Sequence, residues 1–511
     1  MSAKPTHRLP RAGAEREALR KKGQFWTPDW TADIMAAYVL EGKPARLLDP
    51  SLGEGVFFRA AKRHAQSHNF DLALFGRDID PEVINQARMS GLTEDDLRNV
   101  EIRDFVFDPP KDSFPAVIAN PPYIRHHRLS SLQKEHLREF ARKTTGRHID
   151  GRAGLHVYFL IQALRTLAPN GRLAYIVSAD ICEGVFASAL WQWITTHYRL
   201  DAVIAFASEA TPFPDVDTNA LIFLISNARP VPDFDWINCL ECNSREVIAV
   251  ISGQGSKERV GIQVHRRLVT EALATGLSRP PSNDAASEFT LGDFASVMRG
   301  IVTGDNDFFF MTAARARELG IPDSLLISAL GRMRDVQGET FEPADIERLE
   351  SSGRPTRLLN VNGMPYDQLP PSVQEYLEMG EKSGLPDKVL IKTRKPWYRM
   401  EVRKVPPILF AYLGRRSARF IRNRAGVVPL TCLLCVYPKD PAPEFVERLW
   451  RVLSDPETVG NLRKVGKSYG GDAIKVEPRA LERLPLPDAL VRAEGLHECI
   501  SATQGALDFH E

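Results

Sequence analysis

The chain has 511 residues, of which 43% are hydrophobic and 26% are charged, with a formal net charge of +1. This composition is typical of a soluble globular protein, and the length predicts two or three domains. No apolar run reaches the roughly 18 residues of a membrane span, and the N-terminal segment lacks the apolar stretch of a secretory signal.

The first half of the chain alternates short apolar runs with helical patterns, which is typical of a Rossmann-like parallel α/β sheet. A helix is expected over 155–167, where apolar residues recur at every third and fourth position. The last two strands are joined only by a proline-containing loop, so we expect an antiparallel hairpin at the sheet edge. The expected strands are Ala45–Leu48, Leu72–Arg77, Val100–Arg103, Ala116–Ala119, Leu173–Val177, Ala202–Ala205 and Ala220–Ile225.

A turn-rich segment separates this half from the rest of the chain. Residues 276–288 contain prolines, serines and an Asn-Asp pair, a composition typical of a linker. The sequence therefore predicts a first, α/β domain over 1–275, a linker over 276–288 and a second, mixed α/β domain over 289–511.

A glycine-rich turn follows the first expected strand. Gly53 and Gly55 stand between that strand, which ends near Asp49, and an expected helix over 56–65, so the backbone can approach a ligand closely there. Asp78 ends the second strand, 23 residues after Gly55, an offset at which a carboxylate can accept the two hydroxyls of a ribose. Together the two motifs predict a nucleoside site.

Asp104 and Phe105 follow the third expected strand. A carboxylate beside an aromatic ring can hydrogen-bond and flank an adenine. Such a pair is common by itself. Here it follows an expected strand, as the two motifs before it do, and this shared position supports a role at the same site.

The run Asn120-Pro121-Pro122-Tyr123 at the end of the fourth strand carries the chemistry. The exocyclic amine of adenine is a poor nucleophile, because its lone pair is delocalised into the ring. Accepting hydrogen bonds from both of its N–H groups stabilises the charge that develops during attack. Asn120 offers a side-chain carbonyl and Pro121 a backbone carbonyl, which the prolines hold in place, and Tyr123 offers a face to a flipped base.

The order of these motifs resembles that of the gamma-class adenine-N6 DNA methyltransferases of bacterial restriction–modification systems, over most of the chain. The resemblance implies S-adenosylmethionine as the cofactor, double-stranded DNA as the substrate, and a cytoplasmic enzyme. It also implies a seven-stranded sheet with an antiparallel final strand, followed by a C-terminal target-recognition domain.

The resemblance assigns roles to individual residues. Residues 23–28 look like the family's first motif, which contacts the methionine part of the cofactor, so Thr27 is expected at the cofactor. Phe213 resembles the aromatic residue that packs against the flipped adenine. The cofactor motifs match Asp49, Gly53, Gly55, Asp78, Asp104 and Phe105, and the catalytic motif matches Asn120, Pro121, Pro122 and Tyr123.

One stretch departs from the family pattern. Where relatives often carry an Asn- or Asp-Leu-Tyr run, this chain has Gly154-Leu155-His156. We therefore assign no ligand to this segment and interpret His156 as a packed helix residue.

Positive charge is concentrated in the second expected domain. Eleven basic residues lie between Lys392 and Arg424, and Glu401 is the only acid among them. Such a cluster predicts contacts to phosphates or to guanine edges of DNA. The candidates are Arg415, Arg416, Arg419, Arg422 and Arg424.

Two Cys-x-x-Cys pairs, at Cys239 and Cys242 and at Cys432 and Cys435, raise the question of zinc. The second pair lies on an expected strand, where residues three apart point to opposite faces, so we interpret all four as buried thiols and expect no metal site. Six cysteines in 511 residues also indicate a reducing compartment.

Several alternatives remain open from the residues alone. They are cytosine-N4 methylation of DNA, methylation of protein glutamine or of RNA, and a DNA-specificity module without catalysis. Because only about twenty residues precede the first motif, we expect any cognate restriction endonuclease to be a separate chain.

Overall fold

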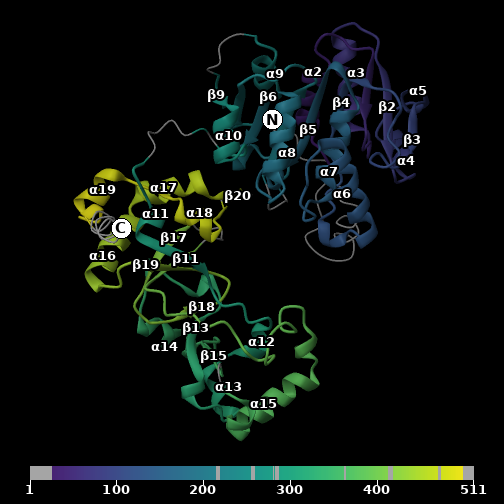
Figure 1. The fold of residues 1–511 in the computed structure, drawn as a ribbon. Helices are drawn as coiled ribbons and strands as arrows, with labels where there is room; N and C mark the ends of the chain where they lie inside the picture. The colour runs from purple at the N-terminus through teal and green to yellow at the C-terminus, as the bar shows by residue number, and fades with distance from the viewer. Residues whose placement is uncertain are drawn as a thin grey trace. The chain divides into compact units, whose positions relative to one another are not determined.

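The computed structural model of the chain (Figure 1) describes residues 26–214, 219–254, 259–279, 281, 287–361, 364–411, 418–469 and 473–498. They form two compact units. The first unit takes the residues up to Pro281, and the second takes most of those that follow. The division falls inside the segment 276–288 that the sequence analysis assigns to a linker.

A nine-stranded sheet forms the centre of the first unit, in the order β3-β2-β1-β4-β5-β7-β6-β8-β9. Its first seven strands are those expected from the sequence, and β7 runs antiparallel to both β5 and β6. The strands are β1 (Arg46–Asp49), β2 (Ala73–Asp78), β3 (Val100–Ile102), β4 (Phe114–Ala119), β5 (Leu167–Ser178), β6 (Arg199–Phe206), β7 (Ala220–Ser226), β8 (Asp233–Cys239) and β9 (Ile262–Leu268). The methyltransferase-like α/β sheet is therefore confirmed, with two strands added.

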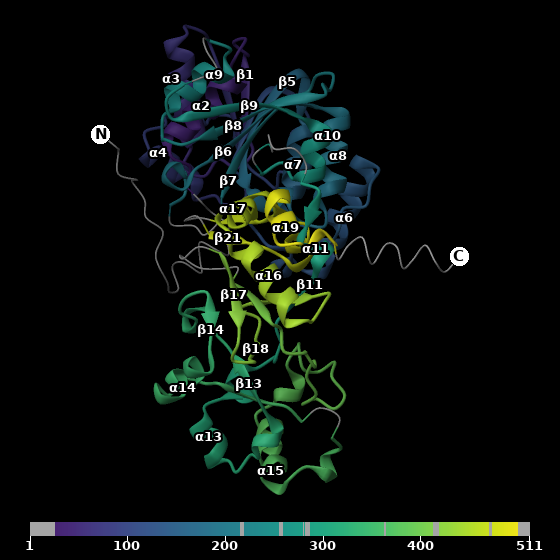
Figure 2. The same cartoon turned by 90° about the vertical axis from the view of Figure 1, so that its left-hand side faces the viewer.

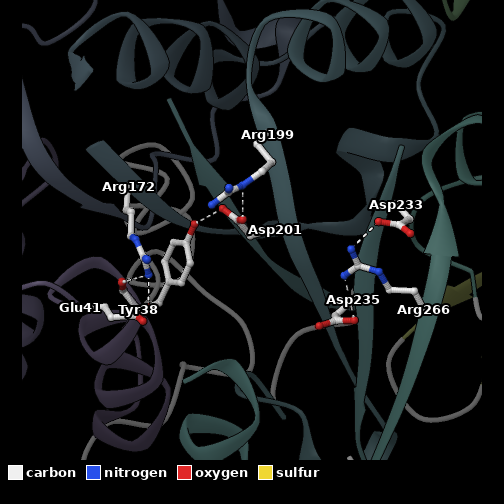
Figure 3. Close-up of polar contacts among 8 residues, drawn as sticks. All are labelled: Tyr38, Glu41, Arg172, Arg199, Asp201, Asp233, Asp235 and Arg266. Atoms are coloured by element: carbon white, nitrogen blue, oxygen red, sulfur yellow. Dashed lines mark hydrogen bonds and ion pairs between the residues drawn. The ribbon is translucent and has the colours of Figure 1, made fainter. Parts of the chain in front are cut away.

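The β6–β7 hairpin does not lie at the sheet edge, and this expectation was wrong. β7 is inserted between β5 and β6, while β8 pairs in parallel with β6 and β9 in antiparallel with β8. Asp235 of β8 lies opposite Arg266 of β9 in the register, and an Arg266 Nη1–Asp235 Oδ1 hydrogen bond of 3.2 Å joins them. Arg266 also binds Asp233, so one guanidinium group joins two carboxylates across the added strands (Figure 3).

Apolar side chains are buried on both faces of the sheet, as a largely parallel sheet requires. Neighbouring residues of β4 show this alternation, because Val117 packs into one buried cluster and Ile118 into the other. The helices of this unit are α2 (Asp29–Val39), α3 (Val56–Ser67), α4 (Val83–Met89), α5 (Glu94–Leu97), α6 (Ser131–Thr145), α7 (Leu155–Arg165), α8 (Ala187–His197), α9 (Ser244–Ile251) and α10 (Val269–Thr275).

Polar contacts fix the end of α2 against the sheet (Figure 3). The Tyr38 hydroxyl donates to Asp201 Oδ2 of β6 at 2.5 Å, and Arg199 Nε donates to the same carboxylate at 2.7 Å. Arg172 of β5 lies over the ring of Tyr38, 5.0 Å from its centroid, and pairs with Glu41. Because a helix is rigid over this length, these contacts also position its first turn, which follows the first motif.

The second unit is a mixed α/β domain (Figure 2), as expected. A five-stranded sheet has the order β11-β19-β16-β17-β14, and a four-stranded sheet has the order β12-β15-β13-β18. The strands after β9 are β10 (Phe289–Thr290), β11 (Ala295–Arg299), β12 (Phe310–Met311), β13 (Leu326–Leu330), β14 (Thr340–Phe341), β15 (Arg357–Leu359), β16 (Ile408–Ala411), β17 (Arg419–Asn423), β18 (Val428–Pro429), β19 (Leu434–Pro438), β20 (Lys467–Tyr469), β21 (Ala473–Lys475) and β22 (Pro485–Leu486).

Short helices cover these sheets, and α16 buries a wide apolar stripe that includes Phe445, Leu449 and Leu453. The helices are α11 (Leu291–Phe294), α12 (Asn306–Phe309), α13 (Ala313–Glu318), α14 (Pro343–Ser351), α15 (Pro371–Lys382), α16 (Pro443–Ser454), α17 (Pro456–Val465), α18 (Pro478–Glu482) and α19 (Asp488–Ala493). Within the described ranges, no helix has the length and apolar character needed to cross a membrane.

The four cysteines of the Cys-x-x-Cys pairs differ in their surroundings. Cys239, at the end of β8, and Cys435, on β19, are buried, and burial raises the pKa of the Cys239 thiol to about 12. Cys432 is half-buried and Cys242 is exposed, so the expectation of buried thiols was wrong for Cys242. The part of the chain that the structure describes holds no group of three or more side chains that could ligate a metal.

Candidate active site

The Asn-Pro-Pro-Tyr motif leaves β4 beside the end of β1. These strands are parallel neighbours, so their carboxyl ends meet at the same edge of the sheet. Asn120 Nδ2 donates to Thr27 Oγ1 at 3.0 Å, and Ser51 Oγ donates to the carbonyl oxygen of Asn120 at 2.9 Å. The structure thus brings the first motif, the glycine-rich turn and the catalytic motif together. Residues 23–25 of the first motif lie outside the described residues.

The glycine-rich turn requires its glycines. Gly53 and Gly55 have φ values of +50° and +72°, in the left-handed region that favours glycine. A Cβ atom at Gly55 would lie 2.4 Å from Leu92 Cδ1, whereas a Cβ at Gly53 would meet nothing closer than 3.9 Å. Between them, Glu54 accepts a 2.8 Å hydrogen bond from Trp26 Nε1. The backbone at Gly53 is therefore open to a ligand.

Two aspartates support this turn, of which Asp49 is buried and Asp78 is half-buried. Asp49 is fully buried, its Oδ1 accepts the backbone N–H of Ser51 at 3.1 Å, and its Oδ2 has no hydrogen-bond partner among the described residues. Burial raises the pKa of Asp49 to about 8. Asp78 accepts the N–H groups of Gly53 at 3.1 Å and of Asp80 at 3.0 Å, and burial raises its pKa as well. Each oxygen of Asp78 keeps a second lone pair for another donor.

Asp104 and Phe105 lie in different surroundings. Asp104 is exposed, and its Oδ1 accepts the backbone N–H groups of Val106 at 2.8 Å and Phe107 at 3.0 Å. The Phe105 side chain is only 2% exposed, and its ring packs against Phe159 with 4.8 Å between centroids. The expectation that the Phe105 ring flanks an adenine therefore needs correction, because Asp104 is the exposed member of the pair and Phe105 is buried.

The two aromatic residues expected at the target base are both half-buried. Tyr123 packs on one buried cluster of the sheet and donates from its hydroxyl to the carbonyl of Ile176 at 3.3 Å. Phe213 packs on the cluster of the opposite face. His156 stacks on Tyr123 from the start of α7, whereas its sequence context predicted only a packed helix residue.

The proposed DNA-binding arginines divide into groups. Arg415 and Arg416 lie outside the described residues. Arg419 donates to the carbonyls of Gly338 at 3.0 Å and Val336 at 3.1 Å.

Arg422 donates to Glu447 at 2.9 Å and to the carbonyl of Pro407 at 2.6 Å, with its side chain 13% exposed. These bonds stabilise the domain, so Arg419 and Arg422 correct the hypothesis that all five arginines face DNA. Arg424 is 50% exposed and lies 3.7 Å from Glu342 and Glu447.

The same basic run contains further cations besides the five arginines proposed from the sequence. Lys392, Lys395, Arg399 and Lys404 are exposed, and none forms an ion pair with a described residue. Residues 400–403 and 405, which follow Arg399, also line a cavity of about 350 Å³, together with residues of β13 and β15. Its polar lining includes Ser328, Asn360, Glu401 and Arg403. Glu401 is the only acid in the run 392–424, and this excess of positive charge is the sequence signal that points to these cations.

The sheet order, with antiparallel β7 between β5 and β6, and the glycine-rich turn after β1 define a methyltransferase of the Rossmann-like class. Comparison with known proteins shows which methyltransferases the chain resembles. The model of the family "N-6 DNA Methylase" matches residues 13–233, and that of "Type II methyltransferase M.Eco57I, C-terminal domain" matches residues 282–505. The chain belongs to the site-specific, adenine-N6 DNA methyltransferases of restriction–modification systems.

Relatives resemble the chain along most of its length. Type II methyltransferase M.AccI of Acinetobacter calcoaceticus is 25% identical, over 91% of this chain and 85% of that protein. Type II methyltransferase M.XamI of Xanthomonas campestris pv. amaranthicola is 26% identical, over 96% and 87%.

A solved structure of the type IIL restriction-modification enzyme MmeI in complex with DNA shares the fold. The TM-score is 0.54 at 11% identity, over 92% of this chain and 64% of that one. The family implies S-adenosylmethionine as methyl donor, and the matches do not favour cytosine, protein, RNA or non-catalytic alternatives.

Proposed function

We propose that the chain transfers a methyl group from S-adenosylmethionine to N6 of an adenine flipped out of duplex DNA, within one specific sequence. One observation carries the proposal: a connected set of hydrogen bonds joins the motifs. Trp26 binds Glu54, Thr27 binds Asn120, and Gly53 binds Asp78. Residues far apart in the chain thus surround one edge of the sheet.

The residues at this edge fit the cofactor. The open backbone at Gly53 leaves room for the amino acid part, and the two oxygens of Asp78 can accept the ribose hydroxyls. The buried Asp49 side chain supports the turn, Asp104 would bind the adenine ring, and Thr27 would lie at the methionine part. S-adenosylmethionine supplies the electrophilic methyl group.

The catalytic motif would prepare the target amine. The carbonyls of Asn120 and Pro121 accept hydrogen bonds from its two N–H groups, which restores nucleophilic character to the nitrogen and stabilises the positive charge formed on it. Pro122 limits the freedom of the turn. Tyr123 and Phe213 would flank the flipped base, and the methylated nitrogen then loses one proton to solvent.

The second unit would recognise DNA. Exposed cations with no ion pair are free to neutralise phosphates, and the polar groups of the adjacent cavity are of the kinds that read base edges. We therefore assign phosphate contacts to Lys392, Lys395, Arg399 and Lys404. Arg424, whose side chain is half exposed but lies 3.7 Å from Glu342 and Glu447, is a further candidate among the five arginines proposed from the sequence.

We also propose a bacterial cytoplasmic setting, in which the modification protects host DNA from a cognate restriction endonuclease encoded as a separate chain. The named relatives are Type II methyltransferases, which supports this assignment.

Sequencing the modified bases in a host that expresses the chain tests the proposal. We expect N6-methyladenine at one recurring sequence with the wild type, and none with Asn120→Ala. Modified cytosine would support the N4 alternative, and an unmodified genome would contradict the proposal.

A further inference from the structure

An imidazole packs directly against the tyrosine of the catalytic motif. His156 is the second residue of α7, and its ring stacks on that of Tyr123 with 6.0 Å between centroids and 28° between planes. The Tyr123 hydroxyl is held at its far end by the carbonyl of Ile176. The ring of Tyr123 is thus restrained both at its tip and against the imidazole.

The surroundings of His156 fix its ring in this position. A Cβ atom at residue 154 would lie 2.8 Å from His156 Cε1 and 2.9 Å from Nδ1, so only glycine leaves room for the imidazole. Tyr175 donates from its hydroxyl to the carbonyl of His156 at 2.6 Å. The N–H of Leu155 binds the carbonyl of Ile124, the residue after the catalytic motif, at 2.9 Å. The start of α7 is therefore attached to the motif.

The imidazole is used as a flat apolar surface. Both ring nitrogens are buried, and neither has a hydrogen-bond partner in the described ranges. Burial lowers the pKa of His156 to about 4, so the ring is neutral at physiological pH. A neutral ring without polar partners contributes through packing and stacking.

We infer that His156 is a positioning residue, whose ring holds Tyr123 in the orientation in which it receives the flipped adenine. The inference rests on the proposed function. His156 acts through Tyr123 and does not touch the reacting atoms.

Two variants of similar size separate stacking from space filling. His156→Phe keeps a flat ring and removes both nitrogens, whereas His156→Leu fills the volume without a ring. We expect single-turnover methyl transfer from labelled S-adenosylmethionine to unmethylated plasmid DNA to stay within about 2-fold of wild type for Phe. For Leu we expect a decrease of about 3- to 10-fold, the range of aromatic pair energies. Cofactor affinity should be unchanged in both.

A double-mutant cycle with Tyr123→Leu tests whether His156 acts through Tyr123. If His156 acts through Tyr123, adding His156→Leu to Tyr123→Leu causes little further loss. Wild-type transfer in His156→Leu, equal impairment of both His156 variants, or additive losses would each overturn the inference. A wild-type protein that modifies no adenine would instead contradict the proposed function, so the two failures are distinguishable.

Discussion

At the catalytic edge of the sheet in the first unit, folding brings together residues that are far apart in the chain. In the basic run 392–424 of the second unit, folding places residues that are close in the chain in different surroundings. Asp78 and Asn120 are 42 residues apart in the chain, and each is hydrogen-bonded to the same glycine-rich turn. Arg399 and Arg422 are only 23 residues apart, yet one is exposed and the other is half-buried and hydrogen-bonded to Glu447. Sheet topology brings motifs together, whereas closeness in the chain does not make charges share a surface.

The largest effect should come from Asn120→Ala. Losing the acceptor for the target amine should lower methyl transfer by at least about 10²–10³-fold. S-adenosylmethionine affinity should change little, because the side chain is proposed to act on the base. Single-turnover kinetics and equilibrium cofactor titration measure the two quantities. A near-normal rate would remove Asn120 from the catalytic motif.

Asp78→Ala should weaken cofactor binding by about 10- to 150-fold, the loss expected for charge-assisted hydrogen bonds to a ribose. Equilibrium titration with S-adenosylmethionine measures it. Asp80→Ala is the matched control, because that carboxylate accepts the N–H of Glu82 and is not assigned to the ligand. Equal affinities in wild type and Asp78→Ala would mean that Asp78 only supports the turn.

Variants of Arg399 and Arg422 test whether the basic run contains both a DNA-contacting arginine and a structural one. Arg399→Ala should reduce the slope of log DNA affinity against log salt by about one unit and leave the melting temperature unchanged. Arg422→Ala should instead lower the free energy of unfolding by about 1–3 kcal/mol, because Glu447 and a backbone carbonyl lose their donor. Should Arg422→Ala change the slope while Arg399→Ala does not, the assignment is reversed.

The last effect concerns the pH dependence of stability at Asp49, where burial raises the pKa from its ordinary value of 3.8 to about 8. Between these values the folded state binds more protons at Asp49 than the unfolded state, so this group lowers stability as pH rises. Asp49→Asn removes the effect, and its stability relative to wild type should therefore increase from pH 5.5 to pH 8.5, by at most about 1.4 kcal/mol per pH unit.

Melting temperatures of the cofactor-free proteins measure this trend. The exposed Asp71→Asn serves as the control. A difference between Asp49→Asn and wild type that stays constant with pH would contradict a buried, protonated Asp49.

Much of the first unit could be predicted because its strands are apolar and its motifs stand at strand ends. β8 and β9 were missed, since Asp233, Asp235 and Arg266 give them the charge pattern of loops. Those charges neutralise one another across the strands, which depends on pairing that no local pattern shows. The Thr27–Asn120 hydrogen bond and the stacking on Tyr123 likewise depend on distances across the fold.

The charges on β9 also affect the edge of the nine-stranded sheet. β9 is the outer strand on one side, and an outer strand offers unpaired backbone groups to other chains. Arg266 places an ion-paired, half-exposed guanidinium group on it, and β3 at the opposite side is only three residues long. A strand arriving from another molecule would have to desolvate charge at one side and would find little backbone to pair with at the other. The two borders therefore disfavour aggregation through strand addition.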